Sequence, residues 1–430
     1  MTNGKRGIVI GAGLSGLAAA THLAARGVAV TLFEAAGQAG GRCRSYFDPS
    51  FDGVIDNGNH LMLSGNHAIL AYLNRIGAAA NLSGPDHALF DFVDLKSGAR
   101  WTLRPNEGPL PWWVGSAARR VPGTRPVEYA AYLRLLFAGK RQTVGDVMAC
   151  TGPLWDRLMH PFLLAALNTE PKEASARLAG AILKETLAKG GRAYRPRIAT
   201  PTLAAAFIDP ALEFLRRRGS EVRFNQRLRA VTFGGRAAAA LEFPDATMPL
   251  TRQDAVILAV PPWVAKDLVP KLATPANFRS IVNAHFKFPA PPDLLKQKGV
   301  PAILGVIGGT AEWIFSFADR ISVTVSAADA IVDRDRDALA ETLWADVLRA
   351  LNISAALPPN SLPRWQIVKE KRATFAATPA EDASRPATKT RWRNFFLAGD
   401  WTGTGLPATI EGAVRSGEAA AALALRHLSL

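Results

Sequence analysis

Apolar residues near the N-terminus predict a strand, a helix and a second strand. The apolar run at 7–10 is followed by GAGLSG at 11–16, the alanine-rich LAAATHLAARG at 17–27, and a β-rich run, VAVTLFE, at 28–34. A strand, a tight turn, a helix and a strand within about thirty residues form a βαβ unit. Gly27 stands where a glycine commonly ends a helix.

The middle of the chain changes between helical and strand patterns. Residues 66–77 have the apolar spacing of an amphipathic helix closed by a glycine. Residues 88–103 predict a hairpin that turns at Ser97–Gly98. From about 105 to 190 the pattern is mostly helical and rich in Leu and Ala.

The second half predicts a mixture of strands and helices that ends in a strand, a loop and a helix. Helical spacing returns at 203–218 and 334–352, and strand patterns occupy 221–233, 255–262, 281–326 and 364–375. The tail, residues 394–428, reads as an apolar strand, a glycine-rich loop and an alanine-rich helix. We expect an α/β fold with strands and helices alternating at both chain ends.

Composition narrows the class of protein. The chain has 430 residues, which predicts two or three domains, and 48% hydrophobic with 20% charged residues argues against disorder. Two cysteines exclude a disulfide scaffold and a Cys-rich zinc site, so we predict no metal centre. The sequence has no apolar run of about 18 residues, so no transmembrane helix is predicted. A net charge of +15 favours an anionic partner, which leaves nucleic acid, an anionic membrane and a phosphorylated ligand open.

Gly11, Gly13 and Gly16 form a G-x-G-x-x-G turn between the first strand and the first helix. In that context the glycines permit a tight turn, close approach of the backbone to a pyrophosphate, and tight packing of the helix on the strand. Glu34, eighteen residues after Gly16, can accept hydrogen bonds from ribose hydroxyls and would repel a 2′-phosphate, which favours FAD or NAD over NADP. The alternative is a set of glycines that only packs the helix.

Two further segments favour FAD. Gly40, Gly41 and Arg42 follow the acidic residue and suit the pyrophosphate of FAD, whereas the alternative is a loop with a solvated arginine. Near the other end, Asp400 closes an apolar strand and can accept hydrogen bonds from the ribityl hydroxyls. The following loop and helix start, residues 402–410, would bring backbone N–H groups to the flavin edge that becomes negative on reduction.

These motifs resemble the FAD-dependent amine oxidase and phytoene desaturase superfamily. The resemblance rests on GAGLSG with Glu34, on AGGRCRS at 39–45 and on LAGDWTGTGLPATIEGAVRSG at 397–417. Two further segments, residues 55–77 and 365–379, look like the squalene-associated branch of that superfamily. The resemblance to this branch extends over nearly the whole chain. The resemblance implies reduction of hydroxysqualene to squalene by reduced FAD, on the bacterial route to hopanoids.

The resemblance also carries individual positions. It implies that the backbone of Val222 meets the adenine and that Pro407, Ala408, Thr409 and Ile410 form the flavin segment with Asp400. The cysteine that holds the flavin covalently in some amine oxidases has no counterpart near this tail, so the FAD is predicted to be non-covalent.

The implied reaction needs an acid near the flavin, because an allylic hydroxyl leaves only when it is protonated. Asp56 and His60 are the candidate acids, although either residue can instead hold the loop, bind FAD or pack. The alternatives are an oxidative desaturase of a carotenoid-type substrate, an amine oxidase, and a lipid-carrier or assembly partner that keeps FAD only structurally. An amine oxidase commonly has an aromatic pair near the flavin, for which Trp401 alone is a poor substitute.

The positive charge gathers around the helical part of the chain. Residues 100–141 contain eight Lys/Arg and two Asp/Glu, and residues 184–197 contain five and one. Basic residues beside Trp, Pro and Leu favour an anionic membrane surface over nucleic acid, for which no binding motif is present; a scattered solvated surface is the alternative. We therefore predict a cytoplasmic protein, peripheral on the inner face of the cell membrane. No second G-x-G-x-x-G turn marks a nicotinamide site, so a separate electron donor is predicted.

The flavin motifs at both ends predict a discontinuous domain. We expect an FAD-binding domain of Rossmann type from residues 1–75, 195–265 and 385–430. The inserted mixed α+β substrate domain would comprise 76–194 and 266–384.

Overall fold

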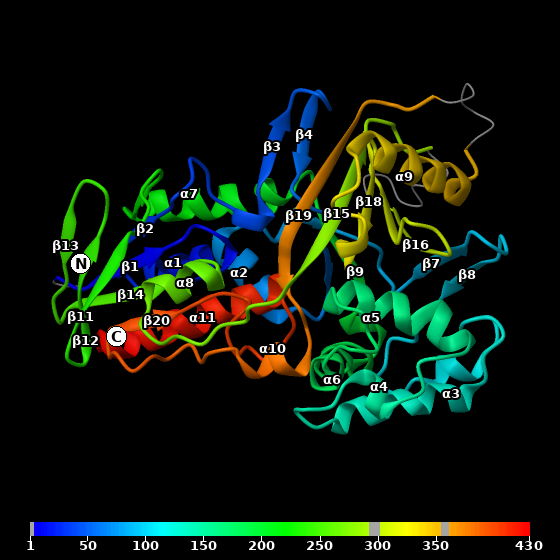
Figure 1. Ribbon diagram of the computed structural model, residues 1–430, viewed down its shortest axis with the longest axis horizontal. Coiled ribbons are helices and arrows are strands. Elements are labelled where there is room, and N and C mark those ends of the chain that lie inside the picture. The colour runs from blue at the N-terminus through cyan, green and yellow to red at the C-terminus, as the bar shows by residue number, and fades with distance from the viewer. Residues whose placement is uncertain (1–3, 292–301, 354–360) are drawn as a thin grey trace.

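The computed structural model of the chain describes residues 4–291, 302–353 and 361–430. Two large sheets organise these residues, one with five parallel strands and one with seven mostly antiparallel strands. Figure 1 shows the parallel sheet beside both termini, the seven-stranded sheet toward the other end of the long axis, and a group of short helices below that second sheet. The predicted α/β class is confirmed.

The parallel sheet contains the predicted βαβ unit. Its strands, in the order β10-β2-β1-β14-β20, are Glu221–Arg223, Ala29–Phe33, Arg6–Ile10, Asp254–Leu258 and Phe395–Leu397. Helix α1 (Leu14–Ala25) connects β1 to β2. Strands from both ends of the chain therefore pair within one sheet, although the predicted domain boundaries stay a prediction.

Alternate residues of β1 face different layers, because side chains alternate across a strand. Ile8 and Ile10 belong to the same core as Phe243, which stacks on Phe33 of β2 with ring centroids 4.5 Å apart. Phe243 directly follows the middle strand of a small antiparallel sheet, made of β11 (Ala230–Gly234), β12 (Ala237–Glu242) and β13 (Thr247–Pro249). Val9 faces the other way, into the core formed with α1 and α11 (Ile410–His427). Burial on both faces explains the unbroken apolar run that the sequence shows here.

The seven-stranded sheet places an aromatic row on one face. In the order β19-β15-β18-β17-β16-β7-β8 its strands are Trp365–Phe375, Phe278–Phe286, Ile321–Val325, Trp313–Ser316, Ala302–Ile307, Phe90–Asp94 and Arg100–Leu103. Ile314 of β17 packs in the core under α9 (Arg336–Leu351), whereas Trp313, Phe315 and Phe317 belong to the core on the opposite face. The predicted hairpin at 88–103 is confirmed as β7 and β8.

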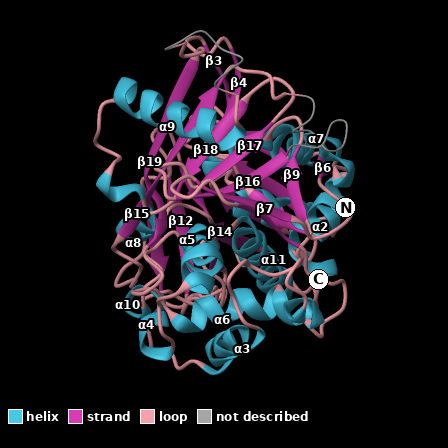
Figure 2. Cartoon of the chain, turned by 90° about the vertical axis from the view of Figure 1, so that its right-hand side faces the viewer, coloured by secondary structure: helices cyan, strands magenta, loops and turns pink. Residues whose placement is uncertain are grey.

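Short helices gather beside that opposite face, at one end of the molecule in Figure 2. They are α3 (Pro126–Ala130), α4 (Val144–Val147), α5 (His160–Leu167) and α6 (Ala176–Glu185). The mostly helical pattern predicted for 105–190 is confirmed, although the longest of these helices spans only ten residues. No helix in the described part of the chain is both long and apolar enough to cross a membrane.

The remaining strands and helices lie outside the two large sheets and the group of short helices. They are the hairpin β3 (Ser45–Asp48) and β4 (Gly53–Asp56), the small sheet β5 (Leu61–Leu63), β9 (Pro196–Ala199) and β6 (Leu82–Ser83), and the helices α2 (His67–Ile76), α7 (Asp209–Arg217), α8 (Pro262–Leu268) and α10 (Pro379–Ala383). The predicted helix at 66–77 is confirmed, but the β3–β4 hairpin was not predicted. Asp56, expected in a loop, is therefore the last residue of a strand. The hairpin escapes the pattern because it exposes apolar side chains, Phe47 and Val54.

Candidate active site

The glycine turn after β1 has the backbone that its sequence predicts. Gly11 has φ +104°, a region that favours glycine, and a Cβ on Gly16 would lie 1.9 Å from the carbonyl oxygen of Gly11. A Cβ on Gly13 would meet no protein atom within 4 Å, so this backbone is open to close approach by a ligand. Helix α1 begins directly after it with no acidic residue in its first turn and no side-chain cap, which suits an anionic group.

The second glycine motif lies against the first. Gly40 donates its N–H to the carbonyl oxygen of Ala12 at 2.9 Å and forms a parallel bridge with Gly13. Gly40 and Gly41 both have positive φ, +110° and +55°. The two glycine motifs, predicted from separate stretches, therefore form one surface of closely spaced backbone.

Glu34 lies at this surface, just after β2. Its carboxylate accepts hydrogen bonds from the N–H of Ala12 at 2.7 Å and of Ala36 at 2.8 Å. Val222 is in β10, paired with Leu32 of β2, so it lies on the strand adjacent to the one that leads to Glu34. The ribose contact of Glu34 and the adenine contact of Val222 stay predictions.

Arg42 joins the two ends of the chain. Its Nη2 donates to both carboxylate oxygens of Asp400, at 2.7 and 2.8 Å, and its Nη1 donates to the carbonyl oxygen of Ala373. Asn57 is 3% exposed and lies beside this pair, and its Oδ1 has no hydrogen-bond partner in the described residues. Thr409 begins α11 and accepts the N–H of Gly412 at 3.0 Å, so Ala408 and Ile410 flank a helix start. Closely spaced glycine backbone, an open helix start and a buried amide oxygen without a partner among the described residues fit a dinucleotide cofactor.

A small cavity lies beside Phe315 and Phe317, two aromatic residues of the row on the seven-stranded sheet. Asp56, Asn59 and His60 are the polar residues that line its volume of about 10 Å³. Its other lining residues are apolar: Ile198, Ala199, Leu203, Phe315 and Phe317. A volume of that order matches one water molecule or one hydroxyl group.

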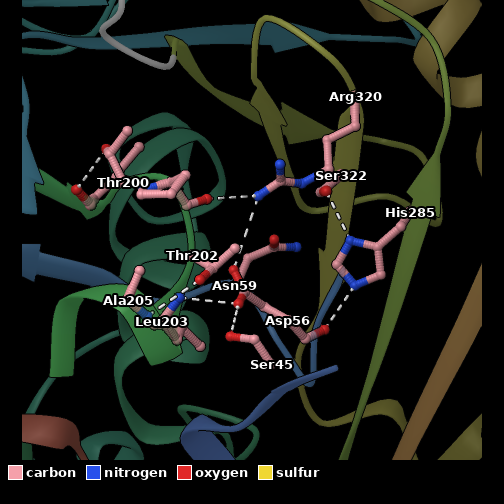
Figure 3. Close-up of polar contacts among 12 residues, drawn as sticks. Ser45, Asp56, Asn59, Thr200, Thr202, Leu203, Ala205, His285, Arg320 and Ser322 are labelled. Carbon is pink, nitrogen blue, oxygen red and sulfur yellow. Dashed lines mark hydrogen bonds and ion pairs between the residues drawn. The ribbon is translucent and has the colours of Figure 1, made fainter. Parts of the chain in front are cut away.

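The two carboxylate oxygens of Asp56 have different surroundings (Figure 3). Oδ1 accepts from the hydroxyl of Ser45 at 2.6 Å and from the N–H of Leu203 at 2.9 Å. Oδ2 lies 3.9 Å from Nη2 of Arg320, which is beyond hydrogen-bond distance. Burial raises the pKa of Asp56 above its usual range, against the opposing effects of the two donors and of Arg320. Asp56 therefore combines a carboxyl biased toward its protonated form with one oxygen free of close donors.

Comparison with known proteins places the chain in a family. The profile of the flavin containing amine oxidoreductases matches residues 14–425. The chain belongs to the flavin-containing amine oxidoreductase family. A flavin is therefore its cofactor, and the glycine motifs and Glu34 fit FAD.

Relatives within this family are similar over the whole chain. A hydroxysqualene dehydroxylase from Rhodopseudomonas palustris is 53% identical, over 97% of each chain, and one from Zymomonas mobilis is 46% identical, over 97% of this chain and 99% of the relative. Among solved structures, the cyclohexylamine oxidase of Brevibacterium oxydans has a TM-score of 0.72 at 14% identity, over 99% of this chain and all of that one. The latter likeness concerns the fold alone.

His60, the second candidate acid, lines the same cavity, but its surroundings favour the deprotonated ring. Removal from water, together with the nearby charge of Arg42, lowers its pKa to about 4. The ring is therefore neutral at pH 7, and a neutral imidazole is a poor proton donor. Of the two predicted acids, Asp56 is the one whose protonation the surroundings favour.

Two residues beside Asp56, His285 and Arg320, were not predicted from the sequence. His285 on β15 donates from Nε2 to the carbonyl oxygen of Asp56 at 3.0 Å and accepts at Nδ1 from the hydroxyl of Ser322 at 2.8 Å. Burial lowers the pKa of His285 to about 3, so this ring is a neutral link. Arg320 approaches Asp56 from the turn before β18 (Figure 3). Nothing in the sequence around either residue marks it as part of a site.

Three further residues near the cofactor motifs are buried and have structural rather than catalytic surroundings. Glu411 is 4% exposed and accepts the N–H groups of Ala68 and Ile69 at the start of α2. Burial raises the pKa of Cys43 to about 12, so its thiol is protonated and inert. Trp401 is 2% exposed and donates to the carbonyl oxygen of Val260, so it is not available to cage an amine.

Proposed function

We propose that the chain reduces hydroxysqualene to squalene with reduced FAD. The observation that carries the proposal is the identity of 46–53% to hydroxysqualene dehydroxylases over 97% of the chain. The site agrees with that chemistry, because a single buried acid lines an otherwise mostly apolar cavity about the size of a hydroxyl group. Amine oxidation is not favoured, since Trp401 is held in the core.

In this mechanism the protein supplies the proton and excludes water. Asp56 gives a proton from Oδ2 to the allylic hydroxyl as the carbon–oxygen bond breaks, and the oxygen leaves as water. Reduced FAD, when bound, supplies the hydride that takes the place of the hydroxyl group on that carbon. Ser45 and Leu203 hold Oδ1, which fixes the direction of Oδ2. The apolar walls of the cavity limit capture of the resulting allylic cation by water.

The experiment is the conversion of hydroxysqualene by the purified holoenzyme under chemical reduction. We expect squalene, detected by gas chromatography and mass spectrometry, and no desaturation of phytoene by the oxidised enzyme. Phytoene desaturation without squalene formation would instead favour the oxidative alternative. A purified protein without flavin absorbance would contradict both versions. Because the sequence has one G-x-G-x-x-G turn, we propose that a separate reductase supplies the electrons in the cell.

We further propose that the protein docks on the anionic inner face of the cell membrane through residues 110–137, the exposed apolar segment. The large apolar side chains exposed in the described chain are concentrated there: Leu110 (78%), Trp112 (61%), Val127 (69%), Leu133 (57%) and Phe137 (87%). Their elements are neighbours, since the ring of Trp113 contacts that of Tyr129 on α3. Exposed apolar side chains in such a group are typical of an interaction surface.

Charge and shape around the segment fit a lipid surface. Arg104, Arg134, Lys140 and Arg141 are exposed and form no ion pair with a carboxylate in the described residues. The guanidinium of Arg119 lies 4.6 Å from the ring centroid of Trp112, at a cleft of about 650 Å³ that both residues line. Basic groups around exposed aromatic residues suit an interface that is apolar inside and anionic outside. A substrate as apolar as hydroxysqualene resides in such a membrane.

A further inference from the structure

Arg320 is a buried cation in the turn between β17 and β18. The residue is 4% exposed, and its guanidinium carbon lies 4.0 Å from the ring centroid of Phe317. Nη1 donates to the exposed carboxylate of Asp319 at 3.0 Å, whereas Nη2 donates to the carbonyl oxygen of Pro201 at 3.4 Å and lies 3.9 Å from Oδ2 of Asp56. Nε has no partner within the described residues. Burial of a guanidinium is costly unless it is fully paired, and these partners leave Nε unpaired, so its position beside Asp56 calls for a reason.

The contacts of Asp56 provide that reason. Its Oδ1 is occupied by Ser45 and Leu203, and no donor in the described chain lies within hydrogen-bond distance of Oδ2. The guanidinium of Arg320 is too far from Oδ2 to donate a hydrogen bond to it, so it does not occupy the oxygen that carries the proton. At 3.9 Å it is close enough to stabilise the carboxylate that remains when the proton has left.

The other groups that face Asp56 carry no charge at neutral pH. His285 of β15 and His60 of the same cavity have lowered pKa values of about 3 and 4, and the thiol of Cys43 is protonated. Ser45 of β3 and the backbone of Leu203 are neutral donors. Among the described residues, Arg320 is thus the charge that acts on this carboxyl.

We propose that Arg320 is a positioning residue for proton transfer, which sets how readily Asp56 yields its proton to the departing hydroxyl and holds the carboxylate that forms. The inference rests on the proposed function. In the step itself the O–H bond of Asp56 breaks, the hydroxyl oxygen takes the proton, the carbon–oxygen bond breaks and water leaves. Solvent returns the proton to Asp56 after turnover.

The test is the pH dependence of single-turnover squalene formation by the reduced holoenzyme. The rate falls at alkaline pH as Asp56 loses its proton, so the alkaline limb reports the pKa of Asp56. Arg320→Gln removes the favourable charge and moves this limb upward by about 1–3 pH units. Its plateau rate falls, because a weaker acid transfers its proton more slowly. Arg320→Lys keeps the charge and returns the limb toward its original position. A merely structural role would lower the rate at every pH and leave the limb unmoved.

A second variant tests the sign from the opposite direction. Asp319→Asn removes an exposed carboxylate that partly balances Arg320, so the limb moves downward, by a few tenths of a pH unit because solvent screens the exposed group. Arg349→Gln is the matched control, since Arg349 pairs with a buried carboxylate, Asp346, at 3.6 Å on α9. This control leaves the limb in place. If Arg320→Gln fails to retain FAD, the Asp319→Asn variant alone tests the inference. An alkaline limb that is unchanged or moves upward in Asp319→Asn overturns it.

The failure of the inference and that of the proposed function give different results. Wild-type protein that makes no squalene contradicts the proposed function. Wild-type squalene formation that survives in Asp56→Asn contradicts the role of Asp56, and with it the inference. Loss of squalene in Asp56→Asn, with an unmoved limb in Arg320→Gln, overturns the role of Arg320 alone. The carboxyl band of Asp56 in the infrared spectrum, identified by its loss in Asp56→Asn, checks the same pKa without turnover.

Discussion

Replacement of Phe137 by serine tests whether residues 110–137 dock on a membrane. Phe137 is 87% exposed, so its ring adds little to the folded protein and is available to enter the lipid. Burial of a phenylalanine side chain contributes about 1.5–3 kcal/mol, and most of that is open to Phe137. With about 1.4 kcal/mol for each factor of ten, we expect Phe137→Ser to weaken vesicle binding by roughly 10- to 100-fold.

The assay is co-sedimentation with vesicles of phosphatidylcholine and phosphatidylglycerol at several ionic strengths. Binding should rise with the anionic fraction and fall with salt, because exposed basic groups contribute about 1 kcal/mol each near an anionic surface. Phe47→Ser is the matched control, since Phe47 is 61% exposed on the β3 hairpin, far from residues 110–137 in Figure 1. Both variants should unfold at the wild-type temperature.

Three outcomes would refute the reasoning about the membrane. They are binding that does not depend on the anionic lipid, an equal loss in Phe47→Ser and Phe137→Ser, and a Phe137→Ser variant that binds as well as the wild type. The last result would leave the exposed apolar segment without the role that its exposure suggests.

Four other substitutions test the site and the fold. Gly13→Ala should leave the apoprotein folded, because the added Cβ meets no protein atom within 4 Å. It should lower the FAD content, read from the flavin absorbance, because the Cβ enters the space open to the cofactor. Full flavin content would contradict this placement of the cofactor. Asp56→Asn should slow single-turnover squalene formation by about 10²–10⁴-fold with FAD retained, whereas His60→Gln should change it less than tenfold, and the reverse order would make His60 the acid. Arg6→Gln should lower the free energy of unfolding at pH 7 by about 1 kcal/mol, because half-exposed Arg6 donates to buried Asp254 at 2.6 Å. The pKa of Asp254 is lowered in the folded protein, so its stabilising effect is present above about pH 4 and is lost as the pH falls through that lower value. In calorimetry the difference between the two proteins should therefore shrink on acidification below about pH 4, and a constant difference would contradict the pairing.

The cofactor motifs could be predicted because their chemistry is local in sequence. Gly11, Gly13 and Gly16 act within one turn, and Glu34 follows at the end of the next strand. Each position depends on backbone shape or on a short connection, which residue type and spacing encode. Even the contact between Gly40 and Ala12 follows from two loops at the same edge of the parallel sheet.

The surroundings of the acid could not be predicted in the same way. Arg320 and His285 are 264 and 229 residues from Asp56 in the chain, and both reach it through the register of the seven-stranded sheet. His285 lies directly across from Ser322 in that register, so a shift of one residue would turn its ring to the other face. The sequence pattern indicates that strands exist here but does not say which residues of two distant strands face each other.

The most direct test of the central claim is a single turnover of hydroxysqualene by enzyme photoreduced in D₂O without oxygen. Reductive dehydroxylation predicts squalene with one deuterium, on the carbon that lost the hydroxyl group, and one squalene for each flavin reoxidised. The same experiment in H₂O should give unlabelled squalene. Flavin that stays reduced with hydroxysqualene unchanged would contradict the account, and so would squalene without deuterium.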